Sequence, residues 1–68
     1  MKVIYDQDTD TLSIILRPGK VADSDETNEG LIMDYDKAGK LISIELLDAS
    51  DQVNRPHAME FALAGANN

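Results

Sequence analysis

The chain has no cysteine, one histidine and three aromatic residues among its 68 positions. Without cysteine it forms no disulfide, no thiolate zinc site and no thiol nucleophile. His57 supplies the one imidazole, so a histidine-rich metal site within one chain is excluded and a catalytic triad is disfavoured. The aromatic residues are too few to stack nucleic-acid bases, and the four glycines lie too far apart for a phosphate-binding loop. We therefore expect no cofactor.

Basic residues are also scarce, because 6 Lys and Arg stand against 13 Asp and Glu, a net charge of −7. Nucleic acids and anionic membranes bind basic surfaces, so neither partner is expected. The longest apolar runs fall far short of the roughly 20 residues that span a bilayer, and the first residues lack the apolar stretch of a signal peptide. A cytoplasmic location follows as the expectation.

The short length allows one domain and limits its core. A chain of this size buries only roughly 60% of the surface that its unfolded form exposes, so the monomer should be marginally stable. Residues 1–53 are expected to form a β-meander, and residues 54–68 a C-terminal helix and tail.

Four stretches have the composition of strands, and turn residues close each of them. The first two, residues 2–6 and 11–17, flank the turn at 7–10; the next two, residues 31–36 and 40–47, flank a turn at 36–39 that contains Gly39. Together they predict an α+β fold: a four-stranded, mostly antiparallel β-meander with a short C-terminal helix packed on one face. The stretch between the pairs, residues 20–30, is too acidic to pack and should be a solvated connection.

The spacing of apolar residues changes after the last strand. Ser50, with Asp48 before it, can cap a single helical turn through Val53. Pro56 then suits the start of a new helix, and Gly65 suits its end. Helical spacing over this segment joins Ala58, Met59, Ala62, Leu63 and Ala66, with Phe61 at the margin.

The strands carry apolar residues on both faces. Leu12, Ile14 and Leu16 represent the main core face, with equivalent sets in the other strands. The second face still carries four large aliphatic residues, more than a solvated face requires. We therefore expect a homodimer whose interface contains Ile15, Ile32, Leu41 and Leu47. The alternative is that these side chains are scattered and partly exposed, as is common on any surface.

Two groups of carboxylates deserve comparison with known sites. Residues 6–10 begin like a calcium loop, but Thr11 and Arg17 replace the glycine and the bidentate glutamate that the EF-hand needs, which leaves a solvated turn or a looser cation site. Asp34, Asp36 and Glu45 can meet across the second hairpin, where they would either do acid–base work or pair with lysines on a solvated face.

Residues 31–50 also resemble a known signature. They read LIMDYDKAGKLISIELLDAS, with an aliphatic run, Asp-Tyr-Asp, a glycine turn and an acidic aliphatic strand that ends in Asp-Ala-Ser. Residues 5–6 (YD) and 10–14 (DTLSI) match the first hairpin of the same pattern. The chain thus resembles, over residues 1–53, the domain of unknown function 2283 family of small bacterial proteins. The resemblance brings no catalytic residues; it implies a cytosolic protein, and because some members sit beside small toxin-like proteins, an antitoxin-type binding role.

The acidic connection is the most distinctive charged feature. Residues 1–36 hold 9 acidic and 3 basic residues, a net charge of −6. This connection either solubilises the chain or docks a small basic protein through Asp23, Asp25, Glu26 and Glu29. We therefore expect a non-catalytic protein-interaction module, with a carboxylate-dependent or metal-dependent enzyme at a dimer interface as the alternative.

Overall fold

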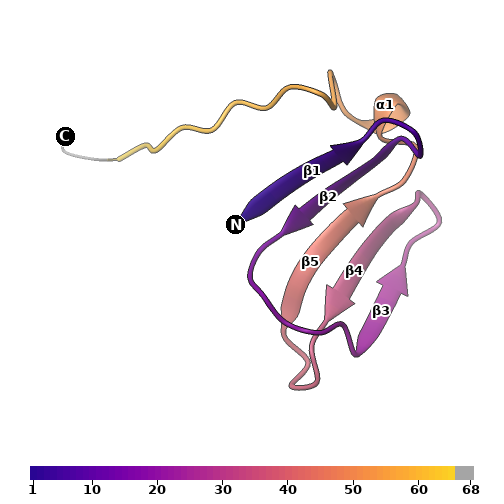
Figure 1. Ribbon diagram of the computed structural model, residues 1–68, viewed down its shortest axis with the longest axis vertical. Coiled ribbons are helices and arrows are strands. Elements are labelled where there is room, and N and C mark those ends of the chain that lie inside the picture. Colours follow the sequence, from indigo (N-terminus) through magenta and orange to yellow (C-terminus); the bar gives the residue numbers. More distant parts are fainter. Residues whose placement is uncertain (66–68) are drawn as a thin grey trace.

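In the computed structural model, which describes residues 1–65, the chain folds into one sheet and a single helical turn (Figure 1). Within these residues five strands and one helix are present, so the predicted mostly antiparallel sheet is confirmed but its number of strands was wrong. The elements are β1 (Lys2–Asp6), β2 (Thr11–Ile15), β3 (Asp23–Glu26), β4 (Leu31–Tyr35), β5 (Leu41–Leu46) and α1 (Ala49–Gln52).

The order of the strands differs from that of the predicted meander. It is β1-β2-β5-β4-β3, with every neighbouring pair antiparallel. The connection after β2 crosses the end of β5 and β4 to reach the far edge of the sheet (Figure 1). Its start is fixed because the backbone N–H groups of Leu16 and Arg17 both donate to the carbonyl oxygen of Ile42, at 2.8 and 3.4 Å. This crossing lets β5 return to the middle of the sheet, beside β2.

Both predicted hairpins are confirmed, and an aspartate side chain stabilises each turn. Asp6 Oδ1 accepts hydrogen bonds from the backbone N–H groups of Asp8 and Thr9, at 3.0 and 3.4 Å. Asp36 Oδ1 accepts from the backbone N–H groups of Ala38 and Lys40, both at 2.9 Å. Gly39 takes a φ of 82°, which side chains disfavour. Local turn chemistry therefore determines both hairpins.

The acidic connection was predicted to be solvated, and its residues 23–26 are indeed exposed, but they form a strand rather than a plain connection. Residues 23–26 form β3, the edge strand that pairs with β4. The pairing begins at Ala22, whose N–H donates to the Tyr35 carbonyl oxygen at 2.8 Å. An edge strand exposes its outer backbone groups, and charged side chains there oppose uncontrolled pairing with other strands. Acidity is therefore compatible with a strand at this position.

The predicted C-terminal helix is absent from the described residues. The single turn expected from Ser50 to Val53 is present as α1, but residues 57–65 contain no helix and run outward from the sheet (Figure 1). A helix of two or three turns needs a surface to pack on, and here the chain leaves the sheet instead. Ala66, which was assigned to the predicted helix, lies outside the described residues.

The register of the strands divides the side chains between two faces. One, here called the apolar face, consists of two rows that run across four strands: Val3–Ile14–Ile44–Met33 and Tyr5–Leu12–Leu46–Leu31. The other, the polar face, carries Ile4–Ser13–Glu45–Ile32–Glu26 and Lys2–Ile15–Ser43–Asp34–Ser24.

Burial is slight on both faces. Among the hydrophobic residues described, only Ile42 and Ala49 are buried, and no large side chain is fully enclosed. Within residues 1–65 no second layer covers the apolar face, whereas stable domains pack at least two layers around a core.

Candidate functional site

The most buried charged group lies on the polar face. Asp34 on β4 has only 3% of its surface exposed, although no helix lies above it in the described part of the chain. Ser24 on β3 donates its hydroxyl to Oδ1 of Asp34, and Ser43 on β5 donates its hydroxyl to Oδ2, both at 2.7 Å. The two flanking strands thus supply donors to both carboxylate oxygens, which compensates for the lost water.

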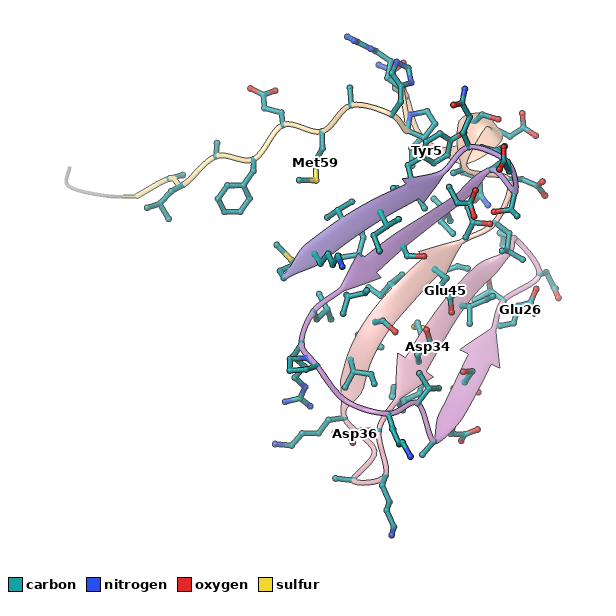
Figure 2. All side chains as sticks on the ribbon, in the orientation of Figure 1. Tyr5, Glu26, Asp34, Asp36, Glu45 and Met59 are labelled. Carbon is teal, nitrogen blue, oxygen red and sulfur yellow. The ribbon has the colours of Figure 1, made fainter. Side chains whose placement is uncertain are left out.

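Glu45 lies beside Asp34 on the polar face and shares a hydrogen bond with it (Figure 2). Burial tends to raise the pKa of Asp34, but the hydroxyls of Ser24 and Ser43 and the bond to Glu45 outweigh burial and lower it. The pKa of Glu45 is raised, first by this hydrogen bond, then by burial and by the negative charge of Asp34. The opposite directions mean that Glu45 keeps its proton to a higher pH than Asp34 does.

Asp36, the third carboxylate of the predicted group, does not join this pair. Its side chain turns to the β4–β5 hairpin, and its Oδ2 lies 3.6 Å from an Arg17 guanidinium nitrogen. The backbone N–H of Lys40 is the main cause of its lowered pKa, with that of Ala38 and the charge of Arg17 adding to it. The prediction was therefore right for Asp34 with Glu45 and wrong for Asp36.

A second polar cluster, centred on Asp10, was missed in the sequence. Its carboxylate accepts hydrogen bonds from the Tyr5 hydroxyl at 2.7 Å, from the Ser50 hydroxyl at 2.6 Å and from the Ser50 N–H at 3.0 Å. Asp48, at the N-cap of α1, makes no side-chain cap bond within the described chain. The predicted capping by Asp48 and Ser50 was therefore wrong, because the cap comes from a turn 40 residues away.

The same contacts shift two pKa values. The donors of Ser50, followed by the Tyr5 hydroxyl, lower the pKa of Asp10, and the bond to Asp10 raises the pKa of Tyr5. Both changes favour an ionised Asp10 hydrogen-bonded to a neutral Tyr5. An open cleft beside this cluster is lined by Tyr5, Gln7, Ser50, Arg55, Pro56 and His57.

Metal binding finds no support in the part of the chain that the structure describes. Across residues 1–65 no three His, Asp or Glu side chains gather in a way that would hold an ion. In the turn that begins like a calcium loop, Asp6 bonds the turn backbone and Asp10 caps α1, so these carboxylates are engaged elsewhere.

The acidic residues predicted to bind a partner are exposed but do not share one face. Asp23 and Asp25 lie on the side of the apolar face, Glu26 lies on the polar face, and Glu29 lies in the turn after β3. They surround the outer edge of β3 rather than forming a patch on the sheet.

The predicted dimer residues are half-buried. Ile15 and Ile32 share the polar face, Leu41 begins β5, and Leu47 follows it, with its N–H bonded to the Gly30 carbonyl oxygen at 2.9 Å. Serine and carboxylate side chains separate Ile15 from Ile32 on this face. Their role as a dimer interface stays a prediction.

The apolar face lies on the opposite side of the sheet. A cleft at its β1–β2 side is lined by Val3, Leu12 and Ile14 together with residues of the segment 53–59, including Pro56 and Met59. Residues 58–65, here called the arm, begin in this cleft with Ala58 and Met59 and then run outward (Figure 1). Their large side chains Met59, Phe61 and Leu63 are 65%, 73% and 82% exposed.

Comparison with known proteins gives one result. Residues 2–50 match the family described as "Protein of unknown function (DUF2283)", and neither a curated protein nor a solved structure matches the chain. None of the helices formed by residues 1–65 has the length and apolar character to cross a membrane. The match covers all five strands and the start of α1, which includes Asp10, Asp34, Glu45 and Ser50. The chain belongs to the DUF2283 family of proteins of unknown function.

Proposed function

We propose that the protein is a non-catalytic interaction module that works as a homodimer, with the apolar face as the interface between the two copies. The observation that carries this proposal is the pair of apolar rows across β1, β2, β5 and β4, whose side chains are only half-buried in one chain. A second copy that covers this face would supply the missing layer around the core.

The exposed area supports this proposal quantitatively. The chain exposes 5280 Å², whereas a compact monomer of its mass, 7.5 kDa, is expected to expose about 4,200 Å². The excess, roughly 1,000 Å², comes from the exposed arm as well as from the half-buried sheet, and it is close to the ~800 Å² that each partner buries in a standard interface. The polar face is a weaker choice than the apolar face, because Asp34, Ser43 and Glu45 interrupt its aliphatic residues.

A matched pair of variants on β1 tests the choice of face. Val3 and Ile4 are neighbours whose side chains lie on the apolar and polar faces, respectively. Val3→Glu should weaken dimerisation at least tenfold, since burying a valine contributes about 1.5–3 kcal/mol, while Ile4→Glu should change it less than threefold. Sedimentation equilibrium gives both constants, and a larger effect of Ile4→Glu would assign the interface to the polar face instead.

The partner in this proposal is a small basic protein, bound at the edge of β3. Four acidic side chains surround this edge, and the outer backbone groups of an edge strand can pair with an added strand. A lysine-rich 20-residue peptide is a suitable probe for fluorescence anisotropy. Asp25→Asn with Glu26→Gln should weaken its binding more than Asp8→Asn with Glu60→Gln, which remove the same charge elsewhere; equal losses would indicate attraction by net charge alone.

One observation favours an enzyme as the second candidate. Asp34 and Glu45 have pKa values shifted in opposite directions, an arrangement that acid–base catalysts also use. Hydrolysis of p-nitrophenyl acetate above the buffer background, abolished in Glu45→Gln and retained in Glu26→Gln, would support it. The clefts described above are lined by other residues, so the interaction module remains the first choice.

A further inference from the structure

The arm has the side-chain pattern of a strand that lies on an apolar surface. Met59, Phe61 and Leu63 alternate with Glu60, Ala62 and Ala64, and in an extended segment alternate residues point to the same side. All three large side chains are more than 60% exposed. Three such neighbours in a row form a continuous apolar ridge, which marks a contact surface more strongly than single exposed residues do.

The arm starts at the apolar face but does not cover it. Pro56 and Met59 line the cleft with Val3, Leu12 and Ile14, and the residues after Met59 continue away from the sheet beyond β1 (Figures 1 and 2). The radius of gyration reflects this extension: it is 13.6 Å, against about 11 Å for a compact chain of the same length. The ridge therefore lies where a second molecule can reach it.

The length of the arm fits the width of the sheet. Eight extended residues span at most about 26–29 Å. Five strands spaced about 4.8 Å apart are about 19 Å wide from the first to the last. An arm that enters from the edge of a second copy can thus cross all five strands of that copy.

We propose that the dimer is formed by exchange of arms, so that residues 58–65 of each copy lie on the apolar face of the other. This inference rests on the proposed dimer and adds that the arm is the segment that covers the apolar face. A two-fold axis makes the contact reciprocal: each copy gives one arm and receives one. In one chain the ridge is exposed to solvent and the apolar face is only half-buried. In the pair, the ridge of each copy covers the apolar face of the other.

Substitution of neighbouring arm residues tests the exchange. Phe61→Asp places a charge on the ridge, and Ala62→Asp places the same charge on the opposite side of the arm. Phe61→Asp should raise the dimer dissociation constant about tenfold to hundredfold, as expected for the loss of one buried aromatic side chain, and Ala62→Asp less than threefold. Because Phe61 is already 73% exposed, the fold of each chain should survive, as circular dichroism would show.

Cross-linking shows whether the arm binds the other copy. Since the chain has no cysteine, Phe61→Cys in one chain can be mixed with Ile14→Cys in another and oxidised mildly. A disulfide between the two chains is expected, and much less of it with Ile15→Cys, which lies on the polar face. Equal cross-linking with both, or an unchanged dissociation constant in Phe61→Asp, would overturn the exchange while the dimer itself stands. A wild-type chain that stays monomeric at 100 μM would instead overturn the dimer.

Discussion

Ser50 donates both its hydroxyl hydrogen, at 2.6 Å, and its backbone N–H, at 3.0 Å, to the carboxylate of Asp10. The backbone N–H of Ala49 adds a bond of 2.9 Å to the Asp10 carbonyl oxygen. These contacts join the first turn of the sheet to α1, which has only four residues and would not persist alone. The matched region of the family ends at this junction, at residue 50.

Ser50→Ala should therefore destabilise the fold. It removes one donor from a cap, which is expected to cost about 1 kcal/mol of unfolding free energy. Urea denaturation measures the loss. Thr9→Ala is the control, because the hydroxyl of Thr9 donates to the exposed hydroxyl of Thr11 and makes no contact with α1 among the described hydrogen bonds. In an Asp10→Asn background the loss should shrink, and full additivity of the two substitutions would contradict the direct contact.

The Asp34–Glu45 pair predicts a dependence of stability on pH. The pKa of Glu45 is raised above its ordinary value of 4.5, so the folded state holds this proton more tightly than the unfolded state. Glu45 therefore adds to the free energy of unfolding. This contribution is fully present below pH 4.5 and is lost as the pH rises through the pKa of Glu45 in the folded state. The contribution of Asp34, whose pKa is lowered, is present above its ordinary value of 3.8 and is lost as the pH falls below it.

Glu45→Gln separates these two effects. The substitution keeps a hydrogen-bond donor for Asp34 at every pH, so thermal stability should no longer fall between pH 4.5 and neutrality, and at pH 7 the variant should melt above the wild type. Glu26→Gln, an exposed residue on the same face, serves as the control. A wild-type melting temperature that rises steadily from pH 4.5 to 7, unchanged by Glu45→Gln, would contradict the raised pKa of Glu45.

Two glycines with nearly the same backbone angle differ in their surroundings. Gly30 has a φ of 81° and Gly39 a φ of 82°, yet a Cβ at Gly30 would lie 3.3 Å from the Leu47 Cβ, whereas a Cβ at Gly39 would meet nothing within 4 Å. Gly39→Ala should cost about 1 kcal/mol for the left-handed conformation alone, and Gly30→Ala clearly more. Equal losses in chemical denaturation would show that Gly30 is not crowded.

The sequence predicted those parts of the fold that depend on neighbouring residues. Both hairpins follow from short-range turn chemistry at Asp6, Asp36 and Gly39, and the pairing of Asp34 with Glu45 follows from the second hairpin. The cap by Asp10 and the place of β5 beside β2 depend on contacts between distant residues, which no local pattern records.

The arm and β3 were mispredicted for different physical reasons. The spacing of Met59 and Leu63 suits one side of a helix, but Met59, Phe61 and Leu63 also suit one side of an extended segment, and the two periods overlap in so short a stretch. The strand β3 was missed because its side chains are acidic and polar, while its stability comes from backbone pairing with β4 and from the bond of Ser24 to Asp34.

In the proposed dimer two copies complete one fold, and sedimentation velocity of the unmodified chain tests this most directly. Over a concentration series from about 1 to 100 μM, the account predicts a species of about 15 kDa, twice the 7.5 kDa of one chain, whose fraction rises with concentration. A chain that remains at 7.5 kDa up to 100 μM while showing cooperative unfolding would contradict it.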